Sequence, residues 1–495
     1  MVGGTRQNGH VGNATRRVGV IGAGPGGICA AIRLLDAGYR DIVVWEKAPR
    51  VGGTWHHNTY PGCACDLPSH LYSFSFEPKL DWTRPYATQP EIQRYLQHCV
   101  DAYGLAPYLR LGVGVTAARW DDDATVWRVE TDDGGVSTVD VVVSAMGMFN
   151  DLNWPDIPGL DGFGGTLFHS ARWDATHDLT GERVAVVGSA ASAVQLAPEI
   201  AKVVGRLYIF QRSPEWVAPK EDTPYTPEQL DAFMTDPAAA QAERDKIWAW
   251  VDVAQTFANP EMRELARQRG LDNLAKVEDP EVRRKLTPDF PYGCKRPLIS
   301  NEWYPMFNRP NVELVTDRIA RLSKDAVVTV DGRERTVDTV ICATGFGTTK
   351  FLSAIAVTGR GGQKVEDAWA EGAQAYLGIT VAGFPNLFML YGPNTNNGSI
   401  IWQIECQVDY IVRHLQRMDE RGIAAIEVKP EVMDEYNARL QRDLDSVEVW
   451  AASNCHNYYR NAAGRIVTQW PHGMGTYKEW TSRPDADAYV ETAVA

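Results

Sequence analysis

The sequence contains two copies of a pattern in which an apolar stretch runs into a small-residue turn and then into a helical stretch. The first copy is RVGVIGAGPGGICAAIRLLDAGY from residue 17, and the second is RVAVVGSAASAVQLAPEIA from residue 183. A strand, a tight turn and a helix in this order open a dinucleotide-binding βαβ unit. Two such units predict an α/β protein with two doubly wound, Rossmann-like domains.

The turn of the first copy has the complete GxGxxG spacing, formed by Gly22, Gly24 and Gly27. The first glycine permits the tight turn, the second admits a pyrophosphate close to the backbone, and the third lets the helix pack on the strand. The next apolar stretch ends at Glu46, 24 residues after Gly22. Because a carboxylate at this place accepts hydrogen bonds from free ribose hydroxyls, we assign this unit to FAD.

The turn of the second copy departs from this spacing, because its three positions are Gly188, Ala190 and Ala193. The methyl group of Ala190 stands where the backbone approaches a pyrophosphate most closely, which puts the nucleotide affinity in question. The following strand ends at Arg212, 24 residues after Gly188, where the first copy has an acid. Since an arginine suits a 2′-phosphate, we expect NADPH here. The expected binding residues of this turn also include Ser189 and Ser192.

Composition limits the remaining possibilities. A chain of 495 residues is expected to form several domains. Its formal net charge of −14 argues against a nucleic-acid or anionic-membrane partner, and it contains no run of about 18 apolar residues to span a bilayer. Eight scattered cysteines, of which only Cys63 and Cys65 are close in sequence, favour reduced thiols in the cytoplasm over a disulfide framework. Their spacing fits no metal site, and none is expected.

The element patterns divide the chain into four parts. We expect a disordered leader over residues 1–16, a first part of the FAD-binding domain over 17–150, the NADPH-binding domain over 151–345, and a second part of the FAD-binding domain over 346–495. Helical spacing over about 225–290 predicts a helical insertion in the NADPH-binding domain. In the last part, the segment LFMLYGPNTNNGS carries Asn394, which we expect to present backbone groups to the flavin.

Two longer motifs accompany the turns. The stretch VGGTWHHNTYPGCACD from residue 51 fits the spacing [AG]GxWxxxx[FY]P[GM]xxxD and contains Gly53, Trp55 and Asp66, which we expect to take part in cofactor binding. The stretch FGGTLFHSARWD lies between the two units and fits the spacing FxGxxxHxxxW[PD] at every specified position. Its matching residues are Phe163, Gly165, His169, Trp173 and Asp174.

Both motifs, together with the two turns, resemble the type I Baeyer–Villiger monooxygenases over roughly residues 17 to 480. The resemblance implies that NADPH reduces FAD and that O₂ then gives a peroxyflavin. This species attacks a ketone to form an ester or lactone, and a sulfide is an alternative substrate. It also implies that Arg296, in the segment KRP, is the active-site arginine. Asp66 would orient it, and Lys295 would join Arg212 at the NADPH phosphate. His169 and Trp173 are assigned to the linker between the domains.

Three alternatives remain open. A flavin-containing N- or S-oxygenating monooxygenase shares both nucleotide sites but is expected to depart from the Trp173–Asp174 end of the linker motif. A flavin disulfide reductase needs a redox cysteine pair on the first helix, which the CxC pair at Cys63 does not supply. A non-enzymatic FAD- and NADPH-binding sensor is favoured only by Ala190.

Overall fold

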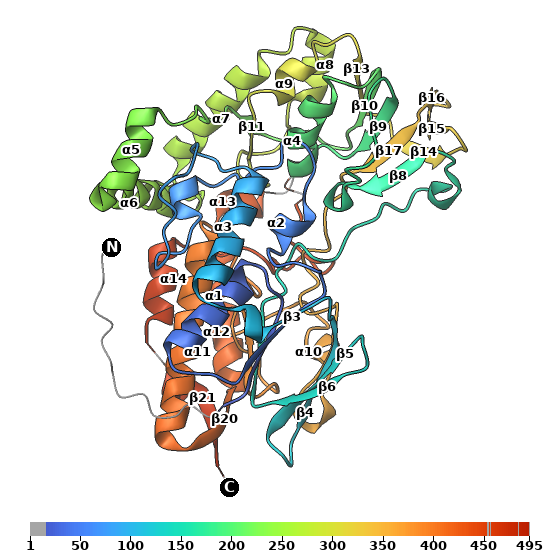
Figure 1. The fold of residues 1–495 in the computed structure, drawn as a ribbon. Helices are drawn as coiled ribbons and strands as arrows, with labels where there is room; N and C mark the ends of the chain where they lie inside the picture. The colour runs from blue at the N-terminus through green and yellow to red at the C-terminus, as the bar shows by residue number, and fades with distance from the viewer. Residues whose placement is uncertain (1–15, 453–454, 456, 484, 495) are drawn as a thin grey trace.

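The chain folds into two open parallel sheets, one for each copy of the strand–turn–helix pattern (Figure 1). The computed structural model describes residues 16–452, 455, 457–483 and 485–494. The expected leader therefore lies outside the described residues, apart from Arg16. The first sheet has the strand order β19 (Leu387–Met389), β7 (Val141–Ser144), β1 (Val18–Ile21), β2 (Ile42–Glu46), β3 (Leu109–Leu111). The second has the order β13 (Val312–Val315), β10 (Arg206–Phe210), β9 (Arg183–Val187), β17 (Thr339–Cys342), β8 (Thr166–His169).

Four strands have the same arrangement in the two sheets, which differ in their edge strands β19 and β8. In each, the strand that precedes the glycine turn pairs in parallel with the next strand of its unit on one side and with a returning strand on the other. Val20 of β1 lies opposite Val44 and Val143, and Val186 of β9 lies opposite Ile209 and Ile341. Continuous apolar strands of this kind are buried on both faces, as parallel sheets require.

Helices cover these sheets and fill the space between them (Figure 1). Helix α1 follows the first glycine turn and α4 follows the second, while α11 packs against α1. The bounds are α1 (Pro25–Asp36), α2 (Thr54–His57), α3 (Gln89–Ala102), α4 (Ala191–Ile200), α9 (Trp303–Met306), α10 (Val365–Ala368), α11 (Ile400–Arg421), α12 (Pro430–Asp445), α13 (Glu448–Ala451) and α14 (Met474–Thr481).

Four consecutive helices occupy the stretch with helical spacing near residues 225–290: α5 (Pro227–Thr235), α6 (Pro237–Ala254), α7 (Pro260–Leu274) and α8 (Pro280–Leu286). Each begins with proline, directly after an N-cap residue whose side-chain oxygen accepts a backbone N–H. These caps are Thr226, Asp236, Asn259 and Asp279. Because proline suits the first helical position and these side chains satisfy free N–H groups, the sequence defines where each helix starts.

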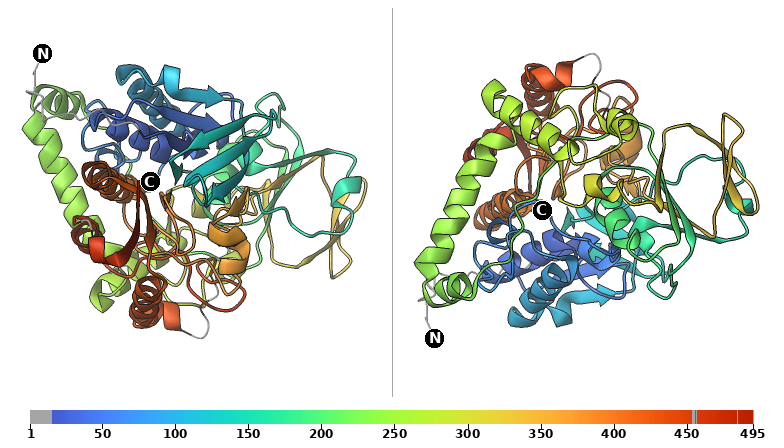
Figure 2. Two further views of the ribbon diagram at one scale, coloured as in Figure 1. Left: turned by 90° about the horizontal axis from the view of Figure 1, so that it is seen from below. Right: turned by 90° about the horizontal axis from the view of Figure 1, so that it is seen from above.

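Helix α6 extends away from the second sheet and contacts helices α11 and α14 in the C-terminal part of the chain. Trp248 of α6 contacts Trp402 of α11 with ring centroids 5.6 Å apart, and the carboxylate of Asp252 accepts the N–H of Gly475 in α14 at 2.9 Å. Figure 2 shows the green α6 running beside the red α14. The helices near residues 225–290 thus tie the two halves of the molecule together.

Small sheets complete the fold. One has the strand order β18 (Ala356–Thr358), β4 (Val115–Asp121), β5 (Val126–Thr131), β6 (Val136–Val139), and another has the order β14 (Ile319–Leu322), β15 (Ala326–Thr329), β16 (Glu334–Thr336). Strands β11 (Val217–Ala218) and β12 (Leu298–Ile299) form a two-stranded sheet, as do β20 (Ile423–Val428) and β21 (Tyr489–Ala493). Within the described ranges, no helix combines the length and apolar character needed to cross a membrane.

Candidate active site

The first glycine turn joins β1 to α1 and is tightly enclosed. Gly22 has a φ of +105°, and a Cβ there would lie 2.7 Å from the carbonyl oxygen of Ala145, at the end of β7. Gly27 lies in the first turn of α1, where a Cβ would meet the carbonyl of Gly22. Helix α1 starts after Gly24 without a side-chain cap, so its first N–H groups face outward. Such a helix start suits a pyrophosphate.

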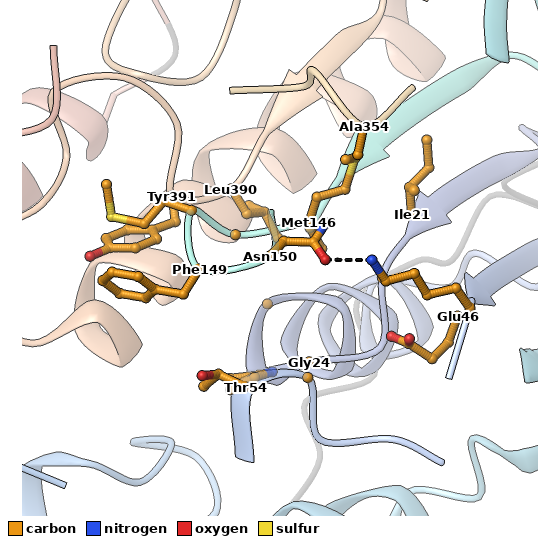
Figure 3. Close-up of a pocket in the computed structure, with 18 of the residues that line it drawn as sticks. Ile21, Gly24, Glu46, Thr54, Met146, Phe149, Asn150, Ala354, Leu390 and Tyr391 are labelled. Atoms are coloured by element: carbon orange, nitrogen blue, oxygen red, sulfur yellow. Dashed lines mark hydrogen bonds between the residues drawn. The ribbon is translucent and has the colours of Figure 1, made fainter. Parts of the chain in front are cut away.

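A long pocket opens from this turn, and Figure 3 shows Glu46 at one end and Tyr391 with Phe149 at the other. The lining combines glycines of the turn with Thr54 and apolar side chains, including Ile21 and Leu390. The elongated shape, with a glycine turn and a helix start along it, fits an extended dinucleotide.

Glu46 is buried at the end of β2, and both of its carboxylate oxygens are engaged by backbone. One accepts the N–H of Ala23 and the other the N–H of Ala48, each at 2.8 Å. The carboxylate therefore braces the glycine turn as well as facing the pocket. This bracing was not predicted, because it depends on the position of Ala23 in the folded turn.

Two basic residues of the pocket were missed by the sequence reasoning. Lys47 donates to the side chain of Asn150 at 2.6 Å, and His57 lines the pocket near Gly53. Burial, with Arg172 nearby, lowers the pKa of His57 to about 4 and also lowers the pKa of Lys47. His57 is thus neutral at physiological pH. The only sequence feature that could have pointed to His57 was its position in the motif from residue 51.

That motif brings its own glycine against the first turn. A Cβ on Gly53 would lie 2.9 Å from the Cα of Gly24, so the two backbones touch. Trp55 does not line the pocket. Its buried indole N–H donates to the hydroxyl of Tyr72 at 3.0 Å, which fixes the loop that leads to Asp66.

The second glycine turn repeats the geometry of the first. Gly188 has a φ of +115°, and a Cβ there would lie 2.4 Å from the carbonyl oxygen of Ala343, at the end of β17. Ala190 is exposed at the start of α4 with φ −91° and ψ −159°, close to the −75° and −169° of Gly24. Alanine therefore fits the backbone, and its methyl group matters only for a bound ligand. Ala193 is buried in α4.

The two serines of this turn have different surroundings. Ser189 is buried, and its hydroxyl donates to the carbonyl of Ser213 at 3.2 Å. Ser192 lies beside Tyr60, which belongs to the motif from residue 51. The second turn is thereby linked both to the segment that carries Arg212 and to the motif from residue 51.

Charged residues gather beyond this turn. Arg212 lies two residues after the end of β10 at Phe210, is exposed, and makes no hydrogen bond or ion pair to the part of the chain that the structure describes. Lys295 donates to the hydroxyl of Ser213 at 2.9 Å and to the carboxylate of Glu215 at 3.0 Å. Glu215 feels the positive charge of both basic residues. The geometry thus brings Arg212 and Lys295, 83 positions apart in sequence, to one site.

Asp66 and Arg296 form a two-pronged ion pair. Nε and Nη2 of Arg296 donate to the two carboxylate oxygens at 2.8 and 3.0 Å, and the side chains are 29% and 34% exposed for Arg296 and Asp66. Asp66 raises the pKa of Arg296 well above its ordinary value. Burial opposes the charge of Asp66, yet Arg296 holds the pKa of this carboxyl below its usual range. Both groups are charged at physiological pH.

The pair lies near one end of the long pocket. The guanidinium of Arg296 interacts electrostatically with Tyr391 and Tyr458, and Tyr391 lines the pocket. Burial, in both cases, raises the pKa of these two phenols. A fixed cation surrounded by neutral hydroxyls is suited to stabilise negative charge on an oxygen atom.

The linker motif forms β8, the edge strand of the second sheet, and the turn that follows it. His169 ends β8 and is fully buried, and its ring contacts Trp154 and Phe346, one on each chain crossing between the halves. Trp173 packs edge-on against Phe168 at 5.1 Å. The remaining motif residues are structural too: Phe163 packs against the second core, Gly165 leaves room for the carbonyl of Asp338, and Asp174 accepts from Thr176 in an exposed turn.

Comparison with known proteins places this geometry in a family. Residues 20–247 match the family described as "Pyridine nucleotide-disulphide oxidoreductase". The chain is 41% identical over 479 residues to a Baeyer-Villiger monooxygenase of Streptomyces coelicolor, covering 96% of this chain and 92% of that protein. The chain belongs to the Baeyer–Villiger monooxygenases.

Solved structures agree with this membership. A cyclohexanone monooxygenase from Rhodococcus sp. Phi1 bound to NADP⁺ superimposes with a TM-score of 0.86 at 32% identity, covering 97% of this chain and 99% of that one. The OTEMO complex with FAD and NADP superimposes with a TM-score of 0.87 at 27% identity, with the same coverage. These matches confirm the predicted Rossmann-like fold, the pair of cofactors and the enzyme class, in preference to an N- or S-oxygenating enzyme or a sensor.

The family description of residues 20–247 names disulfide oxidoreductases, but this Baeyer–Villiger monooxygenase lacks their redox pair on the first helix. Helix α1 contains a single cysteine, Cys29, which is buried and free, and burial raises the pKa of its thiol well above the ordinary value. Cys63 and Cys65 are also free and buried. The match to residues 20–247 therefore reflects shared nucleotide binding.

The expectation about the cysteines differs from what the structure shows in this Baeyer–Villiger monooxygenase. The prediction of reduced thiols alone was wrong, because Cys294 and Cys455 form a disulfide with Cα atoms 5.5 Å apart. Their separation of 161 residues hides this proximity in the sequence. Asn394 does not line the long pocket. Its backbone N–H donates to Val467, and its side chain donates to two further carbonyls of the C-terminal segment.

Proposed function

We propose that the long pocket holds FAD and that the second glycine turn, with Arg212 and Lys295, holds NADPH. The pocket fits because helix α1 starts without a cap and Gly24 and Gly53 leave the backbone bare. Arg212 is exposed, and Lys295 donates to the hydroxyl of the next residue, Ser213, at 2.9 Å. In this assignment residues 17–150 and 346–495 form the FAD-binding domain, and 151–345 form the NADPH-binding domain with its helical insertion.

When bound and reduced by NADPH, FAD supplies the activation of O₂ for insertion of one oxygen atom beside a ketone carbonyl. The residues of this chain prepare the site for that reaction. Arg296 stabilises the negative charge that develops on the ketone oxygen as its carbonyl carbon is attacked. Arginine suits this role because it stays protonated when partly buried. Asp66 fixes the guanidinium, and Tyr391 and Tyr458 place neutral hydroxyls near it.

The observation that carries this proposal is the Asp66–Arg296 pair. The pair joins the motif from residue 51, which carries Asp66, to the segment that also carries Lys295. Arg296 is therefore set between the two expected cofactor sites. A residue that only bound phosphate would have no need of a carboxylate holding two of its three guanidinium nitrogens. The linker residues His169, which contacts Trp154 and Phe346 on the two crossing segments, and Trp173 are proposed to couple coenzyme binding to domain motion.

The test is product identification with isotopically labelled oxygen. The FAD-loaded enzyme would be supplied with NADPH, ¹⁸O₂ and a panel of cyclic and linear ketones, a sulfide and a tertiary amine. We expect an ester or lactone that carries one ¹⁸O atom from at least one ketone. Conversion of the sulfide or amine without any ester or lactone would instead support the N- or S-oxygenating alternative.

A further inference from the structure

Glu215 lies beside the residues expected to bind the coenzyme phosphate, and the sequence motifs give it no role. Strands β11 and β12 pair in parallel, with Val217 opposite Leu298, and the N–H of Leu298 donates to the carbonyl of Trp216 at 2.8 Å. This pairing brings the residues just before each strand together. Glu215 precedes β11 and Lys295 precedes β12, so their contact is built into the backbone.

The contact places a carboxylate on the lysine that should receive a phosphate. Lys295 and Glu215 have side chains only 14% and 13% exposed, and Nζ of Lys295 also lies 4.5 Å from the centre of the Phe290 ring. An ammonium group has three donors. Ser213 and Glu215 accept two of them, at 2.9 and 3.0 Å. At most one donor is left for a ligand unless Glu215 gives way.

A phosphate monoester such as the 2′-phosphate carries a charge of about −1.5 to −2 at pH 7. If it binds Lys295 directly, it lies within a few ångströms of the Glu215 carboxylate, in a place with little water to screen the repulsion. Burial raises the pKa of Glu215, although Lys295 and Arg212 act in the opposite direction. The proposed phosphate site thus has the two cations Arg212 and Lys295, with the acidic group of Glu215 3.0 Å from the ammonium of Lys295.

We infer that Glu215 is a specificity-determining residue that competes with the 2′-phosphate of the coenzyme for Lys295. It holds the lysine in place before the coenzyme binds and limits the affinity for NADPH relative to NADH. This inference rests on the proposed assignment of the second turn to NADPH. In this scheme Arg212, which is exposed and has no hydrogen-bond or ion-pair partner in the described chain, provides the preference for NADPH over NADH. Glu215 sets how large that preference is.

The test uses the FAD-loaded enzyme and its Glu215→Gln variant, which keeps the shape and removes the charge. Dissociation constants are measured by calorimetry for NADP⁺, for NAD⁺, and for adenosine 2′,5′-bisphosphate, which has the 2′-phosphate and lacks nicotinamide. We expect Glu215→Gln to tighten NADP⁺ and the bisphosphate about tenfold or more and to leave NAD⁺ within about threefold.

Two further variants isolate the charge. Glu221→Gln removes the same charge from an exposed residue that pairs with Arg269, and it should leave all three constants unchanged. Glu215→Asp keeps the charge at the site and should retain the wild-type ratio of the NADP⁺ and NAD⁺ constants. If Glu215→Asp tightened NADP⁺ binding as much as Glu215→Gln, charge competition would be disproved.

The outcomes separate this inference from the proposed function. Equal affinity of the wild type for NADP⁺ and NAD⁺ would overturn the NADPH assignment itself. A wild type that prefers NADP⁺, with an unchanged or weaker constant in Glu215→Gln, would leave that assignment standing and overturn the role of Glu215. Weaker binding of all three ligands would make Glu215 a structural support for Lys295.

Discussion

Replacing Asp66 by asparagine tests how firmly the active-site arginine must be held. In the wild type, two charged hydrogen bonds of 2.8 and 3.0 Å fix the guanidinium of Arg296. Asparagine offers one acceptor and no charge. Hydrogen bonds to charged groups contribute about 1.5 to 3 kcal/mol each. Because both side chains are about one-third exposed, we discount the loss to about 1 to 2 kcal/mol in total. The rate of oxygen insertion should therefore fall about fivefold to thirtyfold.

The assay follows the two half-reactions separately. Anaerobic flavin reduction by NADPH is measured by stopped flow, and ester formation is measured in air beside hydrogen peroxide release. Reduction should stay within about threefold of the wild type, while ester yield falls and peroxide rises. Asp338→Asn is the matched control, because Asp338 holds Arg183 by the same two-pronged geometry outside the active site. Wild-type ester yield in Asp66→Asn would refute the orienting role.

Three other variants test separate parts of the structure. Arg212→Ala should reduce the preference for NADPH over NADH about tenfold to a hundredfold in steady-state kinetics, and an unchanged preference would remove Arg212 from the phosphate site. Cys294→Ser opens a disulfide that spans 161 residues, so unfolding stability should drop by about 2 to 5 kcal/mol. A reducing agent should destabilise the wild type in thermal melts but not this variant. Glu313 is held by Arg206 and Arg335; burial opposes its charge, yet the arginines keep its pKa below the ordinary value. Its contribution to stability is present above its unfolded pKa and is lost as the pH falls through the folded one, so Glu313→Gln should melt below the wild type at pH 7 by a margin that shrinks toward pH 4.

Local patterns predicted the parts of the fold that depend on short-range chemistry. The two glycine turns, the acid at Glu46 and the base at Arg212 follow from backbone geometry and from what a ribose or a phosphate requires of a strand end. Proline after an N-cap residue, as at Thr226, defines helix starts within a few residues of sequence. The contact between Asp66 and Arg296 was expected only through the family resemblance, since 230 residues separate them.

Features that depend on long-range packing could not be predicted. Cys294 and Cys455 become partners only because the segment after α13 folds back on the loop before Lys295. The loop contacts are reinforced by Trp450, whose indole N–H donates to the carbonyl of Gly293 at 3.0 Å. Glu215 likewise meets Lys295 only through the pairing of two-residue strands, which leave almost no sequence signal. Asn394 resembled a flavin contact in a glycine-rich loop, yet its hydrogen bonds hold the C-terminal segment.

The central claim, that Arg296 serves oxygen insertion and not flavin reduction, is tested most directly by rapid kinetics on Arg296→Ala. Flavin reduction is a hydride transfer between two bound cofactors and depends on their alignment, whereas insertion develops negative charge on oxygen. Removing a comparable electrostatic donor costs about 3 to 4 kcal/mol, or about a hundredfold to a thousandfold in rate. We predict near-normal anaerobic reduction by NADPH, with ester formation lost and hydrogen peroxide released in air. Near wild-type ester formation, or loss of anaerobic reduction together with ester formation, would contradict the claim.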